Sequence, residues 1–130
     1  MMQKLGAISA FLVVGLLLLA VPTFAHHGTA GMDMTKIVTV KGVVTGFQFI
    51  NPHSQIYVDV KDEHGNVQNW NGELANTLVL HRSGWTSKII KVGDVVTLSG
   101  YQSKKGDKFL RLTTVVLADG KQLDAFPHLE

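Results

Sequence analysis

Two histidines and two methionines lie close together near the start of this sequence. His26 and His27 are adjacent, and Met32 and Met34 follow them after a short segment that contains two glycines. Imidazole nitrogens suit Cu(II), and thioether sulfurs are the soft ligands that Cu(I) prefers. These residue types therefore indicate a copper site, although a glycine-containing segment at the start of a domain is equally typical of a linker.

The residues before His26 have the pattern of a secretory signal peptide. Lys4 gives the leader one positive charge, residues 5–21 are uncharged, and small residues precede a cleavage point after Ala25. An uncleaved membrane anchor is the alternative, but the apolar run falls short of the roughly 20 residues that span a bilayer. We therefore predict a signal peptide over residues 1–25 and a periplasmic or secreted protein.

Cleavage between Ala25 and His26 would change what His26 can bind. Its new α-amino group and its imidazole can close one chelate ring on a copper ion, as in a histidine brace. A further imidazole would complete a set of three nitrogen ligands, and either His27 or His53 can supply it. We favour His53, because a turn between two strands can direct its ring outward from the barrel. His64, in the following hairpin, is expected about 20 to 25 Å away.

Composition excludes several other classes of function. Removal of residues 1–25 leaves 130 − 25 = 105 residues, enough for one small domain. Eleven basic residues then oppose ten acidic residues, because Lys4 is lost, and this balance does not favour nucleic-acid binding. The absence of cysteine excludes disulfides and thiolate ligands. We expect a monomer that has no membrane span after cleavage and binds an envelope ligand or protein.

Periodic apolar residues predict strands with one short helix between residues 36 and 124. The expected strands are residues 37–50, 56–61, 67–71, 95–101 and 109–118, with a short returning edge at 121–123 and a helix at 73–82. Gly42 and Gly46 lie where the first strand changes phase, which indicates a bend. This order predicts an all-β, five-stranded OB-fold-like barrel, and an open β-sandwich is the alternative. Residues 26–35 form an N-terminal extension and residues 125–130 a C-terminal tail.

Aromatic side chains keep a second class of function open. Most of them should be buried, since a domain of this size needs large side chains in its core. Tyr57 alternates away from the apolar residues of its strand, and Trp70 and Trp85 are further candidates for a ligand-binding surface. A glycan, a lipid or another small ligand could bind on such a face of the barrel.

No arrangement of residues predicts catalysis. Asp59, Asp62 and Glu63 are acidic residues near one hairpin, and a solvated turn explains them without a hydrolytic pair. Ser54 follows His53 directly, and adjacent residues on a strand point to opposite faces. A basic segment is interpreted as a solubilising hairpin, with anionic polymers or lipid headgroups as the alternative partners; it contains Lys104, Lys105, Lys108 and Arg111.

A set of short motifs extends through the sequence after the signal peptide. They are His26-His27-Gly28, Asp33-Met34, Gly42-x-Val44-Thr45, Asn51-Pro52-His53-Ser54, Trp70, Gly84-Trp85 and Val92-Gly93-Asp94. With these motifs the chain resembles a family of small secreted bacterial proteins that is known as a domain of unknown function. The resemblance covers essentially the whole mature chain and implies a bacterial exported domain of this size. It brings no activity, cofactor or substrate with it.

Overall fold

A computed structural model of the protein describes residues 29–128. The predicted signal peptide, its cleavage point at Ala25 and the candidate ligands His26 and His27 lie outside the described residues. No helix within residues 29–128 has the length and apolar character needed to cross a membrane.

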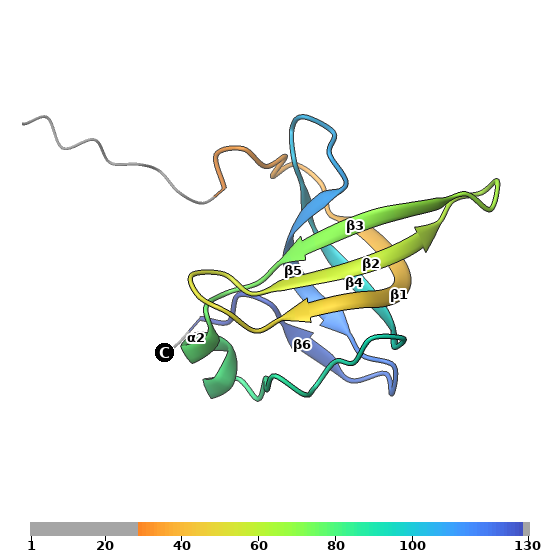
Figure 1. The fold of residues 1–130 in the computed structure, drawn as a ribbon. Helices are drawn as coiled ribbons and strands as arrows, with labels where there is room; N and C mark the ends of the chain where they lie inside the picture. The colour runs from red at the N-terminus through yellow and green to blue at the C-terminus, as the bar shows by residue number, and fades with distance from the viewer. Residues whose placement is uncertain (1–28, 129–130) are drawn as a thin grey trace, which may run out of the picture.

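Five strands close into a barrel, and a sixth strand is added at one edge (Figure 1). Antiparallel pairing gives the order β3-β2-β1-β4-β5-β6, and a parallel pairing between β3 and β5 closes the ring. The prediction of an all-β, OB-like barrel is confirmed, and the open sandwich is not formed. The elements are β1 (Val38–Gln48), β2 (Gln55–Lys61), β3 (Val67–Glu73), α2 (Thr77–Arg82), β4 (Val95–Gln102), β5 (Phe109–Val116) and β6 (Gln122–Asp124).

The long first strand bends as its sequence predicts. It pairs with β4 through its first half and with β2 through its second half, and the register shifts between Val44 and Gly46. Gly42 permits close packing of this strand, because an added Cβ would lie 2.5 Å from the carbonyl oxygen of Asp59. The bend lets one strand belong to both sides of the barrel.

The helix is shorter than predicted. The expected helix over residues 73–82 is wrong for its first part, because Glu73 pairs with Gln55 as the last residue of β3. α2 starts only after Asn76, whose side-chain oxygen accepts a hydrogen bond from the backbone N–H of Val79. Leu80 is fully buried, whereas Leu78 on the same helix is 57% exposed.

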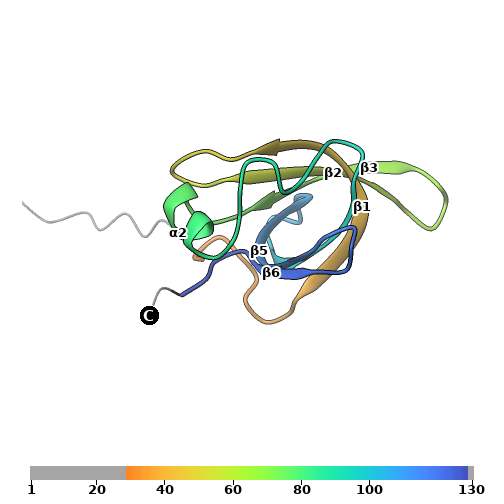
Figure 2. The ribbon, with the colours of Figure 1, turned by 90° about the horizontal axis from the view of Figure 1, so that it is seen from below.

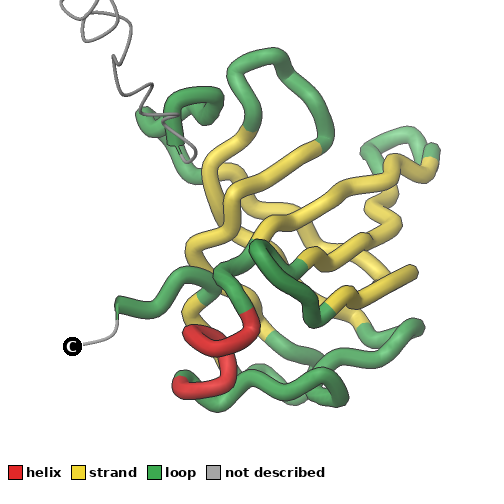
Figure 3. The backbone as a smooth tube through the Cα atoms, turned by 60° about the vertical axis from the view of Figure 1, so that its left-hand side comes forward, coloured by secondary structure: helices red, strands yellow, loops and turns green. Residues whose placement is uncertain are grey.

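The hydrophobic core fills the barrel and continues beneath α2. Figure 3 shows the helix at the end of the barrel opposite the β4–β5 hairpin. Trp85 follows the helix, is fully buried, and donates its indole N–H to the backbone oxygen of Asp124 at 2.9 Å. The core consists mainly of Val44, Ile56, Val58, Trp70, Leu74, Leu80, Trp85, Val96, Leu98, Leu110, Leu112 and Val115.

Both segments outside the predicted barrel boundaries pack against it. Met32 is buried, and its backbone forms an isolated bridge with Ser103 in the β4–β5 hairpin. Ala125 is fully buried, and its carbonyl oxygen accepts a hydrogen bond from the N–H of Ala75. The described chain therefore begins and ends in contact with the barrel, on one side of the molecule (Figure 2).

Candidate functional site

The loop that carries His53 is anchored to the chain just before α2. Ser54 is fully buried; its N–H donates to the oxygen of Ala75, and its own carbonyl oxygen accepts from the N–H of Leu74. The Asn51 side chain accepts hydrogen bonds from both the N–H and the hydroxyl of Thr77. These contacts fix the residues on both sides of His53, so that its ring has a defined position on a short loop.

The ring of His53 contacts the carboxylate of Glu73, and Glu73 in turn lies beside Arg111. The Nδ1 atom of His53 contacts Oε1 of Glu73, while Oε2 of the same carboxylate is 3.7 Å from Nη1 of Arg111. The side chain of His53 is 38% exposed, but that of Glu73 is only 15% exposed. A partly buried carboxylate next to Nδ1 favours the tautomer with its hydrogen on that nitrogen. Nε2 then keeps its lone pair and can bind a metal.

Phe126 lies against both His53 and Arg111. Its ring centroid is 6.1 Å from that of His53, in an edge-to-face arrangement, and 3.9 Å from the guanidinium carbon of Arg111. The C-terminal segment therefore supplies a wall of the site, although its sequence was interpreted as a tail.

A groove of about 510 Å³ begins at this wall and extends to the N-terminal segment. Arg111, Asp124, Phe126 and His128 line it together with Met34 and Thr29, the first described residue. In Figures 1 and 2 the start of the described chain lies on the same side of the barrel as the loop with His53. The groove thus connects the start of the described chain, at Thr29, to the neighbourhood of His53.

The two methionines of the predicted copper site have different surroundings. Met32 is 6% exposed and belongs to the packed interior, whereas Met34 is 45% exposed and lines the groove. Asp33 between them accepts hydrogen bonds from the hydroxyl and the N–H of Thr35, and these bonds lower the pKa of its carboxyl group. The Met34 thioether is therefore the one that a metal at the surface can reach.

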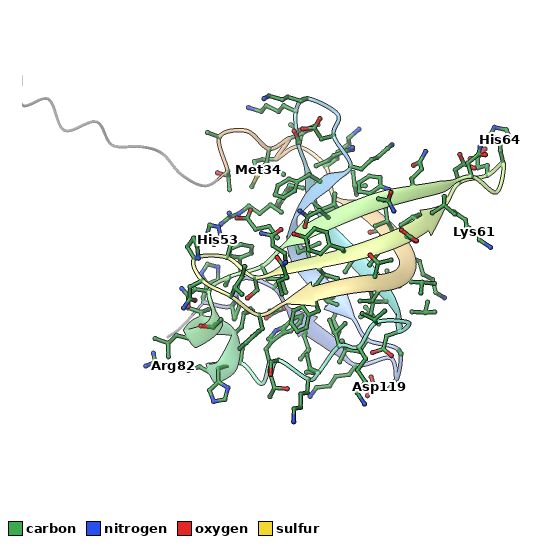
Figure 4. The ribbon with its side chains drawn as sticks, in the orientation of Figure 1. Met34, His53, Lys61, His64, Arg82 and Asp119 are labelled. Atoms are coloured by element: carbon green, nitrogen blue, oxygen red, sulfur yellow. The ribbon has the colours of Figure 1, made fainter. Side chains whose placement is uncertain are left out.

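The remaining histidines are spread over the surface. Figure 4 shows His64 at the tip of the β2–β3 hairpin, at the opposite end of the barrel from His53. His81 is exposed on α2, and His128 is exposed at the edge of the groove. Within residues 29–128, no three histidine or acidic side chains are grouped closely enough to hold a metal ion.

The aromatic candidates do not share one surface. Trp85 is fully buried, so its ring faces the core. Tyr57 and Trp70 line a shallow groove of about 410 Å³ formed by residues of β1, β2 and β3 together with Lys108. Trp70 is only 7% exposed, and the ammonium of Lys108 lies 5.1 Å from the centroid of its ring. Asp59 forms a hydrogen bond with Asn69 beside this groove.

Sequence reasoning missed the residues that surround His53. Glu73 was assigned to a helix, Arg111 to a basic loop, and Phe126 and His128 to a tail. Glu73 carried a detectable signal, because the alternation of Trp70, Gly72 and Leu74 continues the strand past it. Phe126 and His128 carried none, since their position depends on how the C-terminal segment packs.

Comparison with known proteins identifies a family. The model of a family of unknown function (DUF6152) matches residues 13–110. That range includes His26, His27, Met34, His53 and Glu73. No curated protein matches the chain.

Proposed function

The chain belongs to this family of unknown function (DUF6152), and from its side chains we propose that the protein is an exported copper-binding domain in which His26 and His53 share one Cu(II) ion. In this proposal the signal peptide is removed after Ala25 in the bacterial envelope. The α-amino and imidazole nitrogens of His26 bind the ion together, and Nε2 of His53 is the third ligand. Nitrogen ligands of this kind suit Cu(II).

The contact between His53 and Glu73 is the observation that supports this function best. Histidines that bind metals almost always donate their other ring N–H to a carboxylate, a carbonyl or a water molecule. Here that partner is a partly buried carboxylate on a strand, and the ring that it orients remains partly exposed. The pairing gives His53 the tautomer that a metal ligand needs.

The position of the N-terminal segment also supports the proposal. Thr29 lines the groove whose far wall, Phe126, contacts the ring of His53. His26 lies three residues before Thr29, and three extended residues span about 10 Å. Met34 is on the same groove and offers a thioether if the ion is reduced to Cu(I).

Glu73→Gln is expected to weaken Cu(II) binding about 10-fold, because partners of metal-bound histidines typically contribute 10- to 100-fold in affinity. Glutamine keeps the size of the side chain but loses the charge that orients the imidazole. The measurement is a competition titration on protein that begins at His26. Glu63→Gln on the far hairpin is the matched control and should bind as the unmodified protein does. Unchanged affinity in Glu73→Gln would show that the contact between His53 and Glu73 serves the fold alone.

A second candidate function is glycan binding on the outer face of the barrel. Trp70 and Asn71 line the groove beside Tyr57, and their buried atoms Trp70 Nε1 and Asn71 Oδ1 have no hydrogen-bond partner within the described residues. A sugar can stack on an aromatic ring and both donate and accept hydrogen bonds.

Tyr57→Ala is expected to weaken glycan binding about 2- to 10-fold, since aromatic contacts contribute about 0.5–1.5 kcal/mol beyond the area they bury. An oligomer of N-acetylglucosamine is a suitable probe, with tryptophan fluorescence as the signal, because Trp70 lines this groove. Tyr101→Ala, which removes a tyrosine from the other groove, is the control. The absence of a saturable change in the unmodified protein would exclude this ligand.

A further inference from the structure

Arg111 is a partly buried cation whose hydrogen-bonding capacity is mostly unused. Its side chain is 19% exposed, and the central carbon of its guanidinium lies over the Phe126 ring, 3.9 Å from the ring centroid. Glu73 is its one ion-pair partner among residues 29–128, and the 3.7 Å separation exceeds a direct hydrogen bond. A guanidinium has five N–H donors, so most of them are available to a ligand.

The same groove surrounds Arg111 with groups that suit a small organic molecule. Tyr101 and Thr114, which carry hydroxyl groups, line the groove, and the ring of Phe126 is an apolar part of its lining. The volume of about 510 Å³ lies within the usual range for small-molecule sites. Thr113 also lines the groove, but its hydroxyl already donates to the oxygen of Ser99. The groove therefore combines one cation with hydroxyl-bearing and apolar side chains and with the carboxylate of Asp124.

The nearby acidic groups limit which anions can bind. Asp124 lines the groove, and Glu73 lies beside the guanidinium, so a ligand with several negative charges would be repelled. A single carboxylate can form two parallel hydrogen bonds with the guanidinium, and a hydroxyl or amino group on the same molecule can donate to Asp124. His128 at the edge of the groove adds no fixed negative charge.

We propose that this groove binds a small monocarboxylate that also carries a hydroxyl or amino group, with Arg111 as the residue that holds the carboxylate. Phe126 positions the guanidinium by stacking on it. This site does not require copper, and it can be tested on metal-free protein. Its failure would therefore leave the copper proposal unaffected.

A titration with L-lactate, followed through the backbone amide signals of Thr113 and Thr114, tests the proposal. We expect saturable shifts at these residues in metal-free protein and weaker shifts with inorganic phosphate, whose second charge Asp124 disfavours. Arg111→Gln should weaken lactate binding at least about 10-fold, because hydrogen bonds to charged groups contribute about 1.5–3 kcal/mol. Arg82→Gln removes an exposed arginine on α2 and should leave binding unchanged.

Arg111→Lys keeps the site measurable if the glutamine variant does not fold. It retains the charge but cannot form two parallel hydrogen bonds, so we expect binding of intermediate strength. Equal weakening by Arg82→Gln would reduce the effect to overall charge and overturn the proposal. Tighter binding of phosphate than of lactate would overturn the monocarboxylate class, and the absence of saturable shifts would overturn the site.

Discussion

Protein that begins at His26 is expected to bind Cu(II) at least about 100-fold more tightly than the same protein with one alanine added before His26. The added residue converts the α-amino group into an amide and removes it as a ligand, while every imidazole and thioether is retained. Two ligands on one residue act together, because binding of the first places the second at a high local concentration. The loss of the chelate ring that His26 forms with the ion should therefore weaken binding more than a change in a supporting residue such as Glu73.

The comparison needs a control for the extra residue itself. One alanine added after Glu130 lengthens the chain equally at the other end, and this protein should bind as tightly as the one that begins at His26. Competition with a chelator of known affinity measures all three proteins. Equal affinity of the two N-terminal forms would leave the imidazoles alone as ligands and would contradict the role of the amine.

His53→Ala is expected to weaken Cu(II) binding by about 100-fold, at the upper end of the range for a supporting residue. The substitution removes the ligand that the contact with Glu73 orients, and it leaves the α-amino group of His26 intact. Electron paramagnetic resonance on the copper-loaded variant should show one nitrogen ligand fewer than the unmodified protein.

Three other histidine substitutions decide whether His53 is the relevant side chain. His64→Ala changes a histidine at the far end of the barrel, and His81→Ala changes one exposed on α2; both should bind copper normally. His128→Ala is the informative competitor, because His128 lines the groove that also contains Thr29. Loss of affinity in His128→Ala with none in His53→Ala would move the third ligand to the C-terminal segment.

The fold was predicted from local patterns that the structure follows closely. The bend in β1 could be predicted because its buried side chains change phase where Gly46 allows the strand to bulge. The helix was placed too early, because Glu73 and Leu74 fit a helical stripe as well as a strand. Pairing with β2 decides between the two, since it holds Glu73 opposite Gln55. The choice between helix and strand here depends on contacts with another strand, and the periodicity of a single segment gives no information about such contacts.

The candidate site was predictable only in part. His53 was identified from its turn, and the register of the hairpin around Gly65 pairs Gln55 with Glu73, so the carboxylate could have been inferred by extending that register. Phe126 could not, because it reaches His53 through the packing of the C-terminal segment. Trp85 shows the same limit. It was a candidate for a ligand-binding surface, but the packing of the chain that follows α2 buries it completely.

A crystal structure of the protein cleaved after Ala25 and loaded with one equivalent of Cu(II) tests the central claim most directly. The proposal predicts one ion bound by the amine and imidazole nitrogens of His26 and by Nε2 of His53, each about 2 Å from the metal. Nδ1 of His53 should remain in contact with Glu73. An ion bound elsewhere, or bound to His26 without His53, would contradict the shared site.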